Sequence, residues 1–450
     1  MRQGTARGIL VIGAALCGAV IGLLAGAAAE AATLPQYSPD KHIGVTTCAG
    51  STCHGSATPW KNSSVQQNEY ITWEQKDKHA KAYAALKSER AARIVKNLGL
   101  KAATEETVCL NCHTDNIPAA ERGKPFNVAD GVGCEACHGG AERWLGVHVS
   151  GVGTHADNVK AGMYPTDDPV ARANLCMSCH VGIASKYVTH RMMGAGHPRM
   201  PFELDTFTAI EPAHYRVDDD YTKRKQVSNG VQVWAIGQAE AVSHVLDGLL
   251  DPKRNHDGIF PELTFFDCFA CHHPMSNLRW EPRASTGLGP GIPRLNDANL
   301  VMLRVIAQTV DPALAGKLAQ ETRALHQASL QGQDATVAAA KTLKATTSGL
   351  VEKVAQHRFG KAEMSALLVG LVKEGSAGEY INYTAAEQAT MALGSVVSAM
   401  RVANLVDEGQ YKAMRAALDK CYDAVAKDEQ YAPRAYRDAL QSFAGTIPKS

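Results

Sequence analysis

The chain begins with a long run of uncharged, mostly apolar residues. No charged side chain occurs from Gly8 to Ala29, while Arg2 and Arg7 precede the run and Ala29-Glu30-Ala31 ends it with small residues. A basic start, an apolar run and a small-residue end predict a secretory signal peptide over residues 1–31. An uncleaved membrane anchor is the alternative, because a helix rising ~1.5 Å per residue could cross a bilayer with this run.

Apolar positions in the last third of the chain recur at helical spacing. Two stripes predict helices that bury one face, formed by Leu300, Leu303, Val310 and by Leu314, Leu318, Leu325. Asp311-Pro312 predicts a helix start, and Thr384 with Glu387 predicts a capping box. We expect a bundle of about five to six helices over residues 297–450. Cys421, the one cysteine in this region, is expected to be a buried thiol.

Length and charge narrow the classes of function. A chain of 450 residues exceeds what one hydrophobic core usually serves, so we expect at least two domains. The formal net charge is +1, and loss of residues 1–31 removes two Arg and one Glu and leaves no net charge. This balance argues against nucleic acid as a partner.

The cysteines are grouped in a way that disulfides do not explain. An exported chain with twelve cysteines first suggests disulfides, yet ten of them form five local pairs, each followed directly by His. Four pairs have the form Cys-x-x-Cys-His: Cys109, Cys112, His113; Cys134, Cys137, His138; Cys176, Cys179, His180; and Cys268, Cys271, His272. This is the attachment signature of c-type haem. A zinc site would need two such pairs per metal and gives no reason for the histidine.

The chemistry of haem attachment explains the spacing. Two thiols add to the two vinyl groups of one porphyrin edge, and the next residue brings a neutral imidazole to the iron. A fifth pair, Cys48 and Cys53 followed by His54, has four residues between the cysteines. This insert can loop out without moving the terminal Cys-His pair, and a disulfide is the alternative. The sequence thus predicts five covalent haems c, with these five histidines as proximal ligands.

The second axial position of each iron separates an electron carrier from an enzyme, since a six-coordinate haem passes electrons and a five-coordinate haem can bind a small substrate. Twelve further histidines are present. As second ligands we predict His79, His148, His190, His197 and His244. His155 competes with His148, and His214 is a candidate comparable to His244.

The haem-containing region resembles the cytochrome c-554 family, best known from ammonia oxidation. The resemblance is carried by Trp73 to Ala80, Gly131 to Gly139, Cys176 to Gly182, and Gly196-His197-Pro198-Arg199. It implies haems packed in close pairs, mostly with two His ligands, on a helical scaffold, and allows one five-coordinate haem. The Cys268 site and the long tail depart from the family, so the family's partner is not carried over.

The predicted fold is mainly α. We expect a pentahaem cytochrome c-554-like domain over residues 32–285, a linker over 286–296 and the bundle over 297–450. Short helices and loops should dominate the first domain, because porphyrins fill much of its core. The segment from Ala284 to Pro293, rich in Gly and Pro, is typical of a linker.

The leading functional hypothesis is a periplasmic electron-transfer protein with donor and acceptor proteins as partners. The alternative is a multihaem oxidoreductase that acts on a small nitrogen or sulfur compound at one open iron. In the leading hypothesis the bundle is a docking or dimerisation module. Further partner hypotheses are a membrane-associated quinol-oxidising protein and a second copy of the chain.

Overall fold

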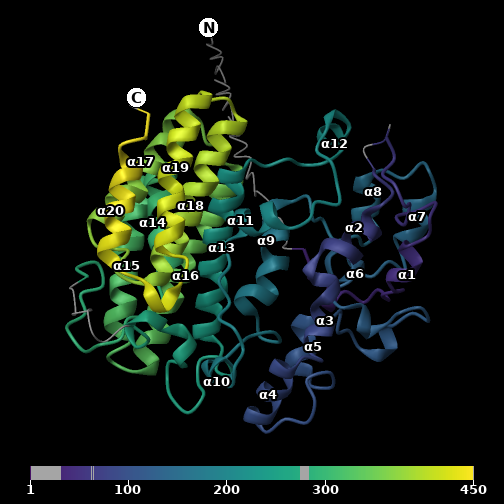
Figure 1. The fold of residues 1–450 in the computed structure, drawn as a ribbon, viewed down its shortest axis with the longest axis horizontal. Coiled ribbons are helices and arrows are strands. Elements are labelled where there is room, and N and C mark those ends of the chain that lie inside the picture. The colour runs from purple at the N-terminus through teal and green to yellow at the C-terminus, as the bar shows by residue number, and fades with distance from the viewer. Residues whose placement is uncertain (2–31, 62, 64, 274–282, 449–450) are drawn as a thin grey trace. The chain divides into compact units, whose positions relative to one another are not determined.

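The computed structural model describes Met1 and residues 32–448, apart from residues 62, 64 and 274–282. The predicted signal peptide lies outside the described residues. Within them the chain forms 20 α-helices, and its only β contacts are three isolated bridges (Figure 1). The predicted mainly α fold class is therefore confirmed. No described helix is both long and apolar enough to cross a membrane.

Short helices joined by loops make up the chain as far as residue 224. They are α1 (Val45–Cys48), α2 (Glu69–Lys76), α3 (Ala82–Ala85), α4 (Glu89–Leu98), α5 (Thr107–His113), α6 (Cys134–His138), α7 (Leu145–Val149), α8 (His155–Lys160), α9 (Pro169–Met177), α10 (His190–Gly194), α11 (Leu204–Ile210) and α12 (Asp219–Arg224). Helix α4 illustrates why they are short. The Ser88 side chain accepts from the Ala91 amide at its start, and Gly99, with a φ of 70°, ends it in the left-handed conformation.

Short turns of 3-10 or π helix occur along the whole described chain. The 3-10 turns are η1 (Pro35–Tyr37), η2 (Lys78–Lys81), η3 (Ala119–Glu121), η4 (Val128–Asp130), η6 (Leu263–Phe265), η7 (Cys268–Ala270) and η8 (Asp428–Gln430). One further turn, η5 (Ser178–Gly182), is a π-helix. Two of these turns, η5 and η7, contain attachment cysteines.

Longer helices form the second half of the chain. They are α13 (Gly230–Leu250), α14 (Ala298–Val310), α15 (Pro312–Ala328), α16 (Gln333–Gln356), α17 (Lys361–Ser376), α18 (Tyr383–Val402), α19 (Glu408–Ala424) and α20 (Pro433–Ala444). Seven of them follow residue 297, where the sequence predicts five to six. The apolar stripes are buried as expected, since Leu303, Leu318 and Leu325 are almost fully covered.

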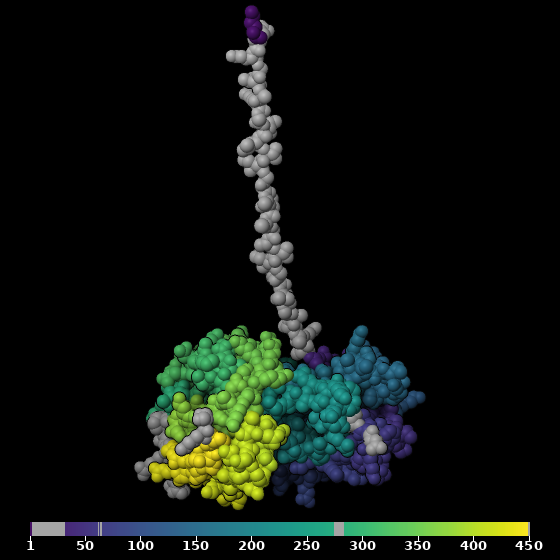
Figure 2. Space-filling view, turned by 90° about the horizontal axis from the view of Figure 1, so that it is seen from above, coloured from purple at the N-terminus to yellow at the C-terminus, as the bar shows by residue number. Residues whose placement is uncertain are grey.

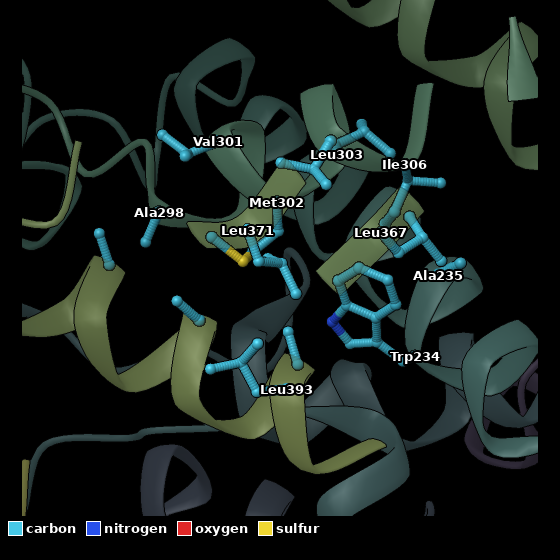
Figure 3. Packing of buried hydrophobic residues seen from close by; sticks show 14 of the residues in the cluster. Trp234, Ala235, Ala298, Val301, Met302, Leu303, Ile306, Leu367, Leu371 and Leu393 are labelled. Atoms are coloured by element: carbon cyan, nitrogen blue, oxygen red, sulfur yellow. The ribbon is translucent and has the colours of Figure 1, made fainter. Parts of the chain in front are cut away.

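Helix α13 lies at the centre of the hydrophobic core. The consecutive residues Trp234, Ala235 and Ile236 are all inaccessible to solvent, so this helix is covered on every side. It packs against α14, α16 and α18 on one side and against α9 on another (Figure 1). Figure 3 shows side chains of α13, α14, α17 and α18 meeting in this cluster, Leu367 and Leu393 among them. The core therefore joins helices from both sides of the predicted linker.

Helix starts in the bundle follow local chemistry. Asp311 caps α15 by accepting from the Leu314 amide, and Pro312 follows at the first helical position, so this prediction is confirmed. The predicted capping box of Thr384 and Glu387 is wrong. Helix α18 begins earlier, with Asn382 as its cap, because the asparagine side chain accepts from the Ala385 amide. Glu387 therefore lies inside the helix, where it forms an ion pair with Arg199.

From Thr33 onward the chain forms one compact unit. In Figure 2 the purple and blue segments cover one side of this unit, the green and yellow segments cover the other, and teal segments lie between them. The division into domains at residues 286–296 stays a prediction.

A buried ion-pair cluster fixes the segment that precedes α14. The guanidinium of Arg283 donates to both carboxylate oxygens of Asp297, at 2.8 and 2.6 Å, and to Glu379 of the α17–α18 connection at 2.8 Å. The side chains of Arg283 and Asp297 are only 1% and 2% exposed. The described residues of this predicted linker are thus held to the bundle at both ends by charge-assisted hydrogen bonds.

Replacing Arg283 by methionine is expected to destabilise the protein by about 3–5 kcal/mol, because the buried carboxylate of Asp297 loses its bidentate cation and Glu379 keeps only the longer ion pair with Arg304, at 3.6 Å. Urea unfolding of the holoprotein, followed by far-UV circular dichroism, measures this. Arg415, which pairs with Asp419 on the surface, provides the control, and Arg415→Met should cost less than about 1 kcal/mol. Equal losses for the two variants would contradict a role for the buried cluster.

Candidate haem-binding sites

Each regular attachment motif forms one turn of helix. Cys109, Cys112 and His113 end α5, and the next motif makes up the whole of α6. The Cys176 motif starts in the last turn of α9 and continues into η5, and the Cys268 motif starts with η7 and ends just after it. Residues i, i+3 and i+4 of a helical turn lie on one face, so both thiols and the imidazole of a motif are presented to the same side. This is the arrangement that one porphyrin edge and its iron require.

The expanded Cys48 motif reaches a similar arrangement through a loop. The His54 amide donates to the Cys48 carbonyl at 3.1 Å, as the His272 amide donates to the Cys268 carbonyl at 2.7 Å in a regular motif. The four residues between the cysteines, two more than in a regular motif, include a turn in which the Cys53 amide donates to the Gly50 carbonyl. The insert therefore loops out, and the same Cys-to-His backbone bond closes the longer motif.

Every proximal histidine faces a second histidine. The ring centroids of the five pairs are 5.8 to 6.5 Å apart, and the pairs are His54 with His148, His113 with His197, His138 with His214, His180 with His79, and His272 with His190. A metal–imidazole bond is about 2.0–2.1 Å long, so two imidazoles on opposite sides of one metal have centroids about 6 Å apart. The histidine pairs and the adjoining cysteines thus fit haem iron with two axial ligands.

Four of the five histidines predicted as second ligands face a proximal histidine: His79, His148, His190 and His197. The structure does not place the fifth, His244, in such a pair. His214 lies opposite His138 instead, at 6.3 Å. This differs from the prediction because His244 belongs to the buried helix α13, where its Nε2 lies 3.1 Å from the Asn174 Oδ1. His155 is bound to Asp167, at 2.8 Å, and leaves His148 as the partner of His54.

Burial keeps several of these imidazoles in the form that binds iron. Burial lowers the pKa of His138 to about 3, and burial together with the nearby His79 lowers the pKa of His180 to about 4. Burial also lowers the pKa of His148 and of His197. These four side chains are therefore neutral at pH 7, and a neutral imidazole can donate its lone pair to a metal.

Hydrogen bonds hold the rings of four of the paired histidines through Nδ1 and leave Nε2 available to a metal. His113 and His197 donate to the carbonyl oxygens of Ala82 and Pro198, at 3.0 and 2.8 Å. His54 donates to the Glu69 carboxylate at 2.9 Å, and His79 to the Asp77 carboxylate at 3.0 Å. Outer partners of this kind orient a histidine ligand and fix its tautomer. Neither carboxylate could be predicted from the sequence, because acidic residues near a histidine are too common to single out.

Asp77, His79 and Glu211 also form a cluster whose ligand atoms lie within 4.8 Å of one another. Such a group could hold a metal ion by itself. The ring of His79 lies 6.3 Å from that of His180, however, and its Nδ1 faces Asp77, so the ring also fits a histidine pair around one iron.

Several attachment motifs are neighbours. The thiols of Cys48 and Cys134 interact electrostatically, as do those of Cys112 and Cys179, and Cys137 also interacts with Cys176 and Cys179. All the attachment cysteines are free of disulfides, so each remains available for haem. The Cys48 and Cys134 sites are therefore adjacent, as are the Cys109 and Cys176 sites.

Residues 47–139 match the family model described as cytochrome c554 and c-prime. The match covers about a fifth of the chain and includes the motifs at Cys48, Cys109 and Cys134. No curated protein and no solved structure matches the chain. The chain therefore resembles the cytochrome c554 and c-prime family over residues 47–139, as its sequence predicts, and this match indicates a c-type cytochrome that carries electrons.

Proposed function

We propose that this chain is an exported electron-transfer protein with five covalent haems c, each held between two histidines. The observation that carries the proposal is the set of five histidine pairs, because every histidine that follows a cysteine pair faces a second one at 5.8 to 6.5 Å. A bound haem supplies a one-electron couple, and the residues determine how it can be used.

Two histidines per iron leave no open coordination position. The pairing therefore favours an electron carrier over the oxidoreductase alternative, which needs one five-coordinate haem. The two thiol contacts, Cys48 with Cys134 and Cys112 with Cys179, support close packing of haems in pairs. Close packing suits fast transfer between neighbours, so the sites act as a relay between one point of entry and one of exit.

Export is part of the proposal, because covalent haem attachment and the predicted signal peptide both agree with a periplasmic location. Donor and acceptor proteins are the expected partners. A membrane-associated quinol-oxidising protein or a second copy of the chain would dock on the bundle.

Mass spectrometry of the holoprotein is expected to show five haems, and its low-temperature EPR spectrum only low-spin iron. The angles between the two imidazole planes of each histidine pair allow a more specific test. Three pairs are nearly perpendicular, at 83° to 85°, while the His54–His148 and His190–His272 pairs are at 18° and 32°. Perpendicular planes give strongly anisotropic signals and near-parallel planes give rhombic ones, so we expect both kinds, in a ratio of three to two. A high-spin share near one-fifth would favour the enzyme instead.

A further inference from the structure

We propose that Glu69 and Asp77 give the two haem sites of each neighbouring pair different reduction potentials. This inference rests on the proposed function and deepens it, because it assigns which haem of each neighbouring pair holds the electron. Glu69 bonds to a ligand of the Cys48 site and Asp77 to a ligand of the Cys176 site. These two sites belong to different neighbouring pairs.

The Glu69 carboxylate is fixed in place by the backbone around it. One oxygen accepts from the Gln66 and Gln67 amides, at 3.0 and 3.1 Å, and the other accepts from His54 Nδ1 at 2.9 Å. Its side chain is 17% exposed. Since neither oxygen is free to turn away, the carboxylate stays aligned with the imidazole.

Asp77 is held in a similar way at the start of η2. Its Oδ1 accepts from the His79 amide at 2.9 Å and lies 3.0 Å from His79 Nδ1. The side chain is only 6% exposed, so water competes little for it. Glu211 adds a second negative charge, with an oxygen 4.0 Å from the same nitrogen.

The other site of each pair lacks such a carboxylate. In the Cys109 site, His113 and His197 donate to backbone carbonyls. In the Cys134 site, no carboxylate within the described residues hydrogen bonds to His138 or His214. Asp77 and Glu211 attract His214 only through space.

A carboxylate that accepts a hydrogen bond from a ligating imidazole makes the imidazole a stronger electron donor. Such a ligand stabilises ferric over ferrous iron and so lowers the reduction potential. A neutral carbonyl has a weaker effect, since hydrogen bonds to charged groups are roughly twice as strong. The Cys48 and Cys176 sites should therefore be the low-potential member of their pairs, and an electron in either pair should rest at the Cys134 or Cys109 site.

The buried charge of Glu135 does not reverse this order of reduction potentials. Glu135 lies between the Cys48 and Cys134 sites and acts on the thiols of both. Its oxygens are already satisfied by three backbone amides, of Ile43, Gly44 and Ala141. It therefore shifts both members of that pair in the same direction.

The test is a potentiometric titration of the five-haem holoprotein with the substitutions Glu69→Gln and Asp77→Asn. Each variant is expected to raise one of the five midpoints by about 59 mV, which is a tenfold gain in the ratio of reduced to oxidised iron at a fixed potential. Asparagine keeps an oxygen for the His79 amide, so the turn itself is preserved. The EPR signal of the affected site should change while the other four stay as they are.

Glu74→Gln is the matched control, because Glu74 lies on the same helix as Glu69 but pairs with Lys81, at 3.1 Å and exposed. This substitution removes one negative charge, as the test variants do, but at a residue that contacts no proposed haem ligand. All five midpoint potentials should therefore stay unchanged within error. Unchanged midpoints in both test variants, or an equal rise of all five, would overturn the proposal. Failure of the proposed function would look different, since the unaltered protein would then show fewer haems or high-spin iron.

Discussion

Alanine in place of His214 is expected to convert about one-fifth of the iron from low spin to high spin. His214 is the ring that faces His138, at 6.3 Å, so the variant leaves His138 as the sole axial ligand of its site. A five-coordinate haem is high-spin and can bind small ligands. EPR of the oxidised protein measures the share of high-spin iron, and carbon monoxide bound per reduced protein should rise from none to one.

His244→Ala is the matched control. Its Nε2 contacts Asn174 and it lies in buried helix α13, so the variant should keep all iron low-spin although it loses a hydrogen bond in the core. High-spin iron in the His244 variant and none in the His214 variant would restore the assignment predicted from the sequence. The pair of variants thus decides which histidine completes the Cys134 site.

The attachment motifs are visible in the sequence because their chemistry is local. A cysteine, a second cysteine and a histidine occupy one turn, and even the expanded Cys48 motif closes with the same backbone bond. The histidines that face these motifs come from distant parts of the chain, as in the pairing of His79 with His180. Nothing in the residues around a distant histidine says which iron it meets, so pairing had to come from the structure.

The difference between His214 and His244 has a physical explanation. His214 lies between α11 and α12 with no motif around it, whereas His244 lies within a long, mostly apolar stretch, Gly230–Leu250. Most residues of this helix are buried, polar ones included, so it is covered on every side. The burial of this helix favours a core role for His244. His214 is then the candidate second ligand at the Cys134 site.

The helices of the bundle could be predicted from the sequence, but the way in which the helices pack against one another could not. Apolar stripes and the Asp311 cap are local signals, and they predict the bundle helices well. The packing of α13 against α14 and α16 is a contact between parts of the chain on either side of the predicted linker. Periodicity shows that a helix has an apolar face and does not show which partner covers it.

The carboxylate of Glu135 connects two neighbouring haem sites, and its loss is expected to be costly. It lies in the Cys134 motif and is only 3% exposed. Its oxygens accept from the amides of Ile43 and Ala141, both at 2.8 Å, and of Gly44, at 2.7 Å. Ile43 and Gly44 precede the Cys48 motif, and Glu135 is part of the Cys134 motif. One side chain therefore connects these two motifs.

Glu135→Ala should lower the free energy of unfolding by about 4.5 kcal/mol or more, because three hydrogen bonds to a charged acceptor are lost at roughly 1.5–3 kcal/mol each and the buried amides of Gly44 and Ala141 are left without this partner. Urea unfolding of the oxidised holoprotein measures this loss. Glu142→Ala is the control, since Glu142 follows Ala141 but is exposed and contacts only Lys41, and it should change stability by less than about 0.5 kcal/mol. A similar loss in both variants would mean that the carboxylate acts through general charge, whereas a large loss confined to Glu135 would show that the two sites are stabilised as one unit.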